Sequence, residues 1–238
     1  MSSTLANRMR PKNLCDIIGQ QHLIGPKAIL TKFVTKNHPF SIILYGNPGC
    51  GKTTIAMALA NDLNIPYRIF NASTGNKKEM DAIIEEAKLS NGLFVIIDEV
   101  HRLNKARQDD LLSHMESGLL IIAGCTTANP FHSINPAIRS RCHILEVKPL
   151  TTAEIIDGLN KAMISPDGLN NEYTIEDEAL YSIAKLSSGD IRYGYNCLEI
   201  CSIVCEKNHI TMNDLKTAAI KTNVVYDKDE DNYYDTLD

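Results

Sequence analysis

The sequence lacks any apolar run approaching the roughly 20 residues that a membrane-spanning helix needs. Its first residues, MSSTLANR, also lack the apolar core of a secretory leader. We therefore expect no membrane partner and a cytoplasmic protein. An excess of basic residues is absent as well, because 24 Lys and Arg stand against 29 Asp and Glu, a net charge of −5. A DNA-binding function cannot be argued from net charge.

Cysteine pairs with the spacing of metal ligands are also missing, although the chain has 7 cysteines. An odd number of cysteines without a leader is typical of reduced thiols in the cytosol. Cys197, Cys201 and Cys205 recur every four residues, so they share one face of an expected helix. No Cys-x-x-Cys spacing completes a tetrahedral zinc set there. We expect these side chains to be buried as small hydrophobic residues.

The strongest motif reads SIILYGNPGCGKTT and spans Ser41–Thr54. A short apolar run ends at Gly46, and a helical pattern begins after Gly51, as in a phosphate-binding loop between a strand and a helix. Glycines let successive backbone N–H groups converge on phosphate oxygens, and the dipole of the following helix favours the same anion. We expect the whole loop to bind a nucleotide: Gly46, Asn47, Pro48, Gly49, Cys50, Gly51, Lys52, Thr53 and Thr54.

Two side chains of this loop have distinct expected roles. Lys52 would reach the β- and γ-phosphates of ATP, and the hydroxyl of Thr53 would bind Mg²⁺. A second pair of polar residues, Asp98 and Glu99, follows the apolar run Leu93–Ile97. In open α/β sheets, ligands bind at the carboxyl ends of such strands. Asp98 would hold Mg²⁺ through water, and Glu99 would polarise the attacking water.

Strand-like and helical patterns alternate up to residue 149, which predicts an α/β fold with a doubly wound parallel sheet. The expected strands are Ile42–Tyr45, Tyr67–Asn71, Leu93–Ile97, Leu119–Cys125 and His143–Val147. Four helices are expected in the same region. The first begins at Pro26 and the second spans Lys52–Leu63. The third has an apolar face from Met80 to Ala87, and the fourth has one from Leu111 to Met115.

The pattern changes near Pro149. From Thr151 to about Thr222 only helical periodicity remains, with Thr151 and Thr174 as expected N-caps. We therefore expect residues 1–149 to form the nucleotide-binding domain and residues 150–223 a small helical lid. Residues 224–238 are rich in acids and are interpreted as a tail or linker.

The continuation of the carboxylate pair, DEVHR, also fits a DExH helicase motif. A helicase of that type needs a second RecA-like domain, and the all-helical region after residue 150 is too short for one. The next strand ends in GCTTANP, and NPAIRSRCHILEV follows. Together with the phosphate-binding loop and the Asp-Glu pair, these features resemble an AAA+ ATPase of the clamp-loader group.

Within that group, RMRPKNLCDIIGQQHLIG, DEVHRLNKARQDDLL and TTANP with SRC are similar to the replication-associated recombination protein A family. This family comprises the bacterial relatives of the Werner-helicase-interacting ATPases, and the similarity covers about Arg8 to Asp235. The resemblance implies that Thr127 is sensor 1, which contacts the γ-phosphate or the lytic water. It implies that Arg141 is an arginine finger for the ATP of a neighbouring subunit, and that Arg192 is sensor 2 in the lid. The alternatives are a surface arginine for Arg141 and an exposed helix residue for Arg192.

The resemblance also implies a function: hydrolysis of ATP-Mg²⁺ at a subunit interface, acting on DNA at stalled replication forks in recombination and repair. The implied partners are forked or junction DNA, single-stranded-DNA-binding protein and further copies of the chain, in the cytoplasm at the nucleoid. The family commonly has Glu where Ala128 stands, and the sequence leaves open whether the role of that carboxylate is lost or kept here. The family continues into a helical C-terminal oligomerisation domain, so we expect a shortened and weakly active chain.

Two alternatives share parts of this interpretation. A clamp-loader subunit would have the same fold, but bacterial loader motor subunits usually carry a zinc-binding cysteine cluster soon after the loop, and no cysteine lies between Gly51 and Cys125. A nucleotide-bound scaffold without turnover would not need the four expected catalytic side chains, which are all present.

Overall fold

The computed structural model of the protein describes residues 3–223, so the expected acidic tail lies outside the described residues. The chain divides into two compact units. One is Arg10–Thr151, and the other joins the segment up to Met9 to the residues from Thr152 onward. The division after Thr151 lies close to the expected boundary. The grouping of the first nine residues differs from the expected domain of residues 1–149.

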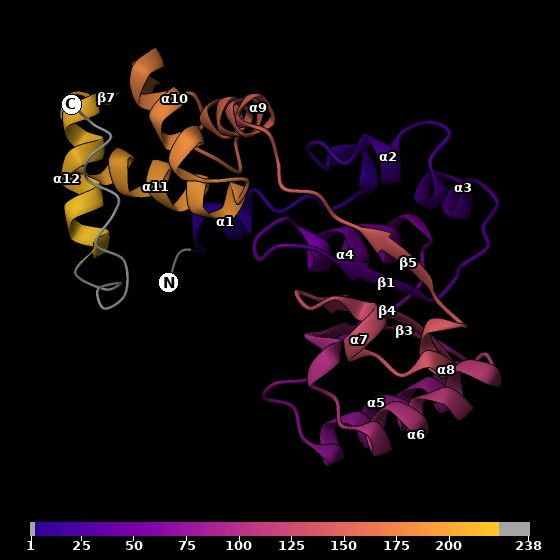
Figure 1. Ribbon diagram of the computed structural model, residues 1–238. Helices are drawn as coiled ribbons and strands as arrows, with labels where there is room; N and C mark the ends of the chain where they lie inside the picture. The colour runs from indigo at the N-terminus through magenta and orange to yellow at the C-terminus, as the bar shows by residue number, and fades with distance from the viewer. Residues whose placement is uncertain (1–2, 224–238) are drawn as a thin grey trace. The chain divides into compact units, whose positions relative to one another are not determined.

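The unit Arg10–Thr151 is built on a five-stranded sheet in which the strand order is β2-β3-β4-β1-β5 (Figure 1). All of its strand pairings are parallel, which confirms the expected α/β class. The strands lie within one residue of their predicted bounds: β1 (Ile42–Tyr45), β2 (Tyr67–Asn71), β3 (Leu93–Asp98), β4 (Leu120–Thr126) and β5 (His143–Glu146).

The alternation of side chains along β3 explains its continuous apolar run. Phe94 and Ile96 pack in a core cluster with residues of helix α4 (Lys52–Asp62). Val95 and Ile97 pack in a second cluster with residues of α5 (Lys77–Ser90) and α6 (Lys105–Glu116). Both faces of the strand are therefore covered, as expected in a parallel sheet with helices on each side. This burial fixes the carboxyl end of β3, where Asp98 lies.

The helices of this unit follow the predicted pattern, with one correction. Pro26 was expected to open a helix, but α3 begins only at Ile29, because Gly25 ends α2 and Ala28 is still in an extended conformation. The helices are α2 (Gln21–Ile24), α3 (Ile29–Thr35), α4 (Lys52–Asp62), α5 (Lys77–Ser90), α6 (Lys105–Glu116), α7 (Pro130–Ser133) and α8 (Pro136–Arg139). Two short 3-10 helices are η1 (Leu14–Asp16) and η2 (Val100–Arg102).

The second unit is mainly helical, as expected, but it also contains a short pair of strands. Its helices are α1 (Leu5–Arg8), α9 (Thr152–Ile164), α10 (Asp177–Leu186), α11 (Ile191–Val204) and α12 (Met212–Asn223). β6 (Thr174–Ile175) pairs in parallel with β7 (His209–Ile210). The prediction of Thr174 as an N-cap was therefore wrong: its backbone N–H donates to the Asn208 carbonyl, and Glu176 takes the N-cap position of α10.

Contacts of α1 explain why the N-terminal segment groups with the helical unit. Leu5 is completely buried, and its backbone N–H donates to Oε1 of Glu199 at 2.8 Å. The guanidinium of Arg8 donates to the carbonyl of Asp167 at 2.9 Å and pairs with the same Glu199. These long-range contacts lie outside what a local sequence pattern can predict.

Two of the three cysteines expected to be buried, Cys197 and Cys201, are buried in α11, whereas Cys205 lies at the C-cap of this helix and is only partly buried. Cys201 has no exposed surface and Cys197 very little. Burial disfavours the charged thiolate and raises the pKa of Cys201 to about 12. Among the described helices, none is both long and apolar enough to span a bilayer.

Candidate nucleotide-binding site

The loop between β1 and α4 turns at glycines whose backbone conformations are strained for other residues. Gly46 has a φ of +154°, and a Cβ built on it would lie 2.1 Å from the carbonyl oxygen of Val147. Gly51 has a φ of +97° and is the N-cap of α4. Both conformations are accessible to glycine at little cost. The loop can therefore turn closely enough to aim its backbone N–H groups at an anion.

Lys52, the first residue of α4, places its ammonium group inside this loop. Its side chain is buried, and Nζ donates to the carbonyl oxygens of Gly46 at 2.9 Å and Asn47 at 2.7 Å. The cation is thus held by the loop's own backbone, next to the N-terminus of the helix. Two sources of positive potential, the ammonium group and the helix dipole, converge on one point.

Thr53 and Asp98 come together from separate elements. The hydroxyl of Thr53, in the first turn of α4, lies 3.4 Å from Oδ1 of Asp98 at the end of β3. A hydroxyl and a carboxylate are oxygen ligands of the kind that Mg²⁺ prefers. Their chemistry and their place beside the phosphate-binding loop fit the expected magnesium position.

Glu99 and Thr127 are also brought into contact, because they follow the neighbouring strands β3 and β4. The hydroxyl of Thr127 lies 3.4 Å from Oε2 of Glu99. Glu99 has a φ of +52°, in the left-handed region that few residues other than glycine adopt. Strained backbone of this kind is concentrated at functional sites. The carboxylate and the hydroxyl share one edge of the sheet with Asp98.

The two expected arginines belong to other elements. Arg141 follows α8, and its guanidinium pairs with Glu116 at the end of α6 and donates to the carbonyl of Ala137 at 2.8 Å. Arg192 belongs to the helical unit, in the first turn of α11, where its backbone N–H donates to Oδ1 of Asp190 at 2.8 Å. The side chain of Arg192 is exposed.

Sequence reasoning missed His101 and Thr126. Nδ1 of His101 lies 3.2 Å from Oε2 of Glu99 and 2.8 Å from the hydroxyl of Thr126. The signal was available in DEVHR, where the histidine was weighed only as part of a helicase motif. Two thiols near the loop, Cys50 and Cys125, are both buried, and burial raises the pKa of Cys125 to about 12.

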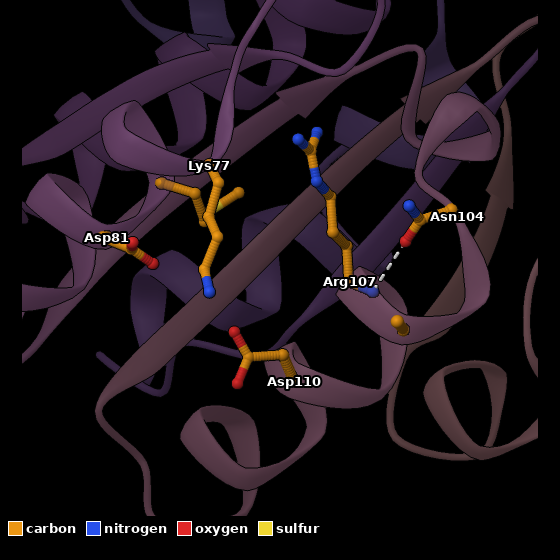
Figure 2. A pocket seen from close by; sticks show the side chains of 7 residues that line it. Lys77, Asp81, Asn104, Arg107 and Asp110 are labelled. Atoms are coloured by element: carbon orange, nitrogen blue, oxygen red, sulfur yellow. Dashed lines mark hydrogen bonds between the residues drawn. The ribbon is translucent and has the colours of Figure 1, made fainter.

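A separate cavity of about 440 Å³ lies between the first turns of α5 and α6 (Figure 2). Figure 2 shows charged side chains of both signs around it: the basic Lys77 and Arg107 and the acidic Asp81 and Asp110. Its lining includes none of the site residues predicted from the sequence. The cavity is therefore distinct from the phosphate-binding loop.

The parallel sheet, the phosphate-binding loop and the polar residues after β3 and β4 together define a nucleotide-binding protein of the AAA class. A model of the ATPase family associated with various cellular activities (AAA) matches residues 42–150, and a model of the AAA C-terminal domain matches residues 169–237. The chain therefore belongs to the AAA ATPases, and within them it is a relative of the replication-associated recombination protein A proteins.

Sequence comparison supports this placement. The chain is 43% identical to replication-associated recombination protein A of Bacillus subtilis, over 98% of this chain and 57% of the relative. It is 34% identical to the Escherichia coli protein of that name, over 98% of this chain and 55% of the relative. It is 30% identical to ATPase WRNIP1 of Dictyostelium discoideum, over 98% of this chain and 30% of that protein. The chain thus spans little more than half the length of the bacterial relatives.

Among solved structures, the chain is similar to the RuvB Holliday junction branch migration motor of Thermotoga maritima. The TM-score is 0.76 and the sequence identity 27%, covering 91% of this chain and 74% of RuvB. The similarity extends beyond the α/β unit, because the matched part exceeds the length of that unit.

Proposed function

We propose that this chain is the motor module of a Mg²⁺-dependent ATPase that works at the interface between two copies of itself. One observation carries the proposal. Lys52, the Thr53–Asp98 pair and the Glu99–Thr127 pair all lie at the carboxyl edge of one sheet, beside a phosphate-binding loop. Membership of the AAA ATPases supports the same conclusion.

Each residue has a separate role in the proposed reaction. The backbone N–H groups of the loop and the ammonium group of Lys52 bind the β- and γ-phosphates. Thr53 would hold Mg²⁺ directly and Asp98 would hold it through water; the chemistry that the ion supplies when bound is neutralisation of phosphate charge. Glu99 orients the attacking water and accepts its proton, and Thr127 contacts the γ-phosphate or that water.

The proposed roles of the two arginines come from the family resemblance. The guanidinium of Arg141 is held at the surface by Glu116 and Ala137, and its hydrogen bonds go to neither the loop nor the carboxylate pair. In line with the resemblance, we assign it to the ATP of an adjacent copy, where it would neutralise charge that develops during phosphoryl transfer. Arg192, exposed on α11, is the proposed sensor 2 for nucleotide bound by its own chain.

The proposed substrate on which the motor acts is DNA at stalled replication forks. The names of its relatives support this: the bacterial ones are replication-associated recombination proteins, and RuvB is a Holliday junction motor. Single-stranded-DNA-binding protein and further copies of the chain are the proposed protein partners. The proposed location is the cytoplasm, at the nucleoid.

An ATPase assay with forked, single-stranded and duplex DNA tests the proposal. We expect Mg²⁺-dependent phosphate release that rises with forked DNA and disappears in Lys52→Ala. Phosphate release that Lys52→Ala leaves unchanged would show a contaminating enzyme. Tight binding of ATP without release, at all protein concentrations and with all DNAs, would instead favour a nucleotide-bound scaffold.

A further inference from the structure

The carboxylate of Glu99 is fixed through one of its two oxygens. Oε2 lies 3.2 Å from Nδ1 of His101 and 3.4 Å from the hydroxyl of Thr127. Within residues 3–223, no hydrogen bond to the other oxygen, Oε1, is found. The side chain of His101 is 16% exposed and that of Glu99 31% exposed. The contact is thus shielded from water more on the histidine side than on the carboxylate side.

His101 is itself anchored to the sheet. It lies in η2, directly after Glu99 and Val100, and its Nδ1 is 2.8 Å from the hydroxyl of Thr126. Thr126 is the last residue of β4 and has no exposed surface. Its hydroxyl also accepts the backbone N–H of Ala128 at 3.0 Å. The imidazole is therefore bound to rigid sheet rather than to a free loop.

The donors and acceptors around Thr126 allow the imidazole proton to lie on Nδ1. A hydroxyl has one proton to donate and two lone pairs that accept. If the Thr126 hydroxyl donates to the carbonyl of Ala128, at 3.4 Å, it can accept from both Ala128 N–H and Nδ1–H of His101. Oε2 of Glu99 then lies 3.2 Å from the same protonated nitrogen, at the distance of an electrostatic contact. An unprotonated Nδ1 would instead accept from the Thr126 hydroxyl and would offer no proton to the carboxylate.

The consequence concerns the water that attacks ATP. A general base works only within hydrogen-bond reach of the proton that it takes. An unrestrained Glu side chain loses rotamer freedom when it is placed, whereas one held by a neighbour is already in position. With Oε2 fixed, Oε1 is the oxygen left for the water.

We propose that His101 is a positioning residue for Glu99: its Nδ1–H holds Oε2 so that Oε1 faces the lytic water. This inference rests on the proposed ATPase function, since it assigns a partner to the proposed base. His101 touches neither nucleotide nor water in this arrangement and acts only through Glu99.

Three substitutions at position 101 separate positioning from packing. Asn carries its amide nitrogen on Cγ, as Nδ1 is carried in His, whereas Gln carries it one atom further out. We expect His101→Ala and His101→Gln to lower kcat about 10- to 100-fold, the usual cost of losing such an outer partner, with KM for ATP nearly unchanged. His101→Asn should recover most of the loss. Equal losses in Asn and Ala variants, or an unchanged kcat in His101→Ala, would overturn the proposal.

A double substitution adds a second readout. If His101 acts only through Glu99, adding His101→Ala to Glu99→Gln should cost no further activity, because interacting residues are non-additive. An additional loss of the same size as in the single variant would indicate a role independent of Glu99. Thermal unfolding midpoints of all variants show whether folding has been affected.

A measurement that needs no turnover keeps this inference separate from the proposed function. Nitrogen-15 spectra of the chain report the tautomer of each of its 7 histidines, and His101→Gln identifies the signal of His101. We expect a protonated Nδ1 in His101, with a signal that shifts in Glu99→Gln. An unprotonated Nδ1 overturns the positioning role even if ATP is hydrolysed. A chain that shows this tautomer but neither binds nor hydrolyses ATP would contradict the proposed function alone.

Discussion

Oγ1 of Thr53 lies 3.4 Å from Oδ1 of Asp98, although 45 positions separate the two residues in the sequence. The contact exists because α4 begins directly after the phosphate-binding loop, while β3 ends at the same edge of the sheet. The two oxygens have different proposed roles: the Thr53 hydroxyl binds Mg²⁺ directly, and the Asp98 carboxylate binds it through water. Removing either should therefore weaken only the Mg²⁺-dependent part of nucleotide affinity.

Asp98→Asn tests this division. The amide keeps the size of the side chain but removes the charge that attracts the hydrated cation. We expect ATP affinity to fall in the presence of Mg²⁺ and to stay nearly the same in EDTA, measured by calorimetric titration. Asp81→Asn, an exposed acid on α5, is the matched control. Equal losses of affinity with and without Mg²⁺ would show that Asp98 contacts the nucleotide itself.

Lys52→Ala should remove nucleotide binding far more broadly. The ammonium group is the buried cation of the loop, held by the carbonyls of Gly46 and Asn47. Without it, the β- and γ-phosphates lose their charge partner. Calorimetry should show a steep loss of ATP affinity, whereas Lys78→Ala, an exposed lysine on α5, should bind normally. Unchanged binding by Lys52→Ala would contradict the assignment of the loop.

Glu99→Gln should separate binding from chemistry. Gln keeps the shape of Glu99 but cannot accept a proton from water. We expect ATP to bind with nearly unchanged affinity while turnover falls by roughly 10²–10⁴, the usual contribution of a positioned base. The decisive comparison is between the two variants: Glu99→Gln should lose kcat and keep its ATP affinity, whereas Asp98→Asn should lose ATP affinity in Mg²⁺. If both variants lost only binding, the proposed division between the two carboxylates would be wrong.

The sheet was predictable because its central strands are buried on both faces and therefore have uninterrupted apolar sequences. The place of Glu99 after β3 followed from the same apolar run, whereas Thr127 was assigned from the family resemblance and its contact with Glu99 was not predicted. Their catalytic roles remain predictions. What local patterns could not supply were contacts between distant elements, such as Leu5 with Glu199. Nor could they supply side-chain geometry, such as the place of His101 between Glu99 and Thr126.

The cysteines offer a test of the core that does not involve nucleotide. Burial disfavours the thiolate, so the pKa of Cys125 is raised to about 12, whereas Cys15 is exposed. Since the thiolate is the reactive form, Cys125 should stay unreactive to iodoacetamide at any pH well below 12, and Cys15 should react first. Mass spectrometry of the folded chain reads this out. Modification of Cys125 as fast as in denatured protein would contradict its burial.

The last prediction concerns Arg141, whose guanidinium is held by Glu116 and Ala137. If it completes the site of a neighbouring copy, Arg141→Ala should leave the ATP affinity of the isolated chain unchanged. Turnover in an assembled oligomer should fall, by about 10³-fold if the arginine has the usual weight of a finger. For the same reason, the specific activity of the unaltered chain should rise with its concentration, because higher concentration drives assembly.

Mixing two inactive variants decides whether the arginine acts between copies. Arg141→Ala keeps an intact ATP pocket, and Lys52→Ala keeps an intact finger, so a mixed assembly contains some complete sites. We expect the mixture of Arg141→Ala with Lys52→Ala to show partial ATPase activity. A mixture of Arg141→Ala with Glu99→Gln should show a similar recovery. The control is Arg141→Ala alone, at the same total protein concentration as the mixture. A specific activity independent of concentration, together with no rescue in either mixture, would place Arg141 outside the reaction of any neighbour.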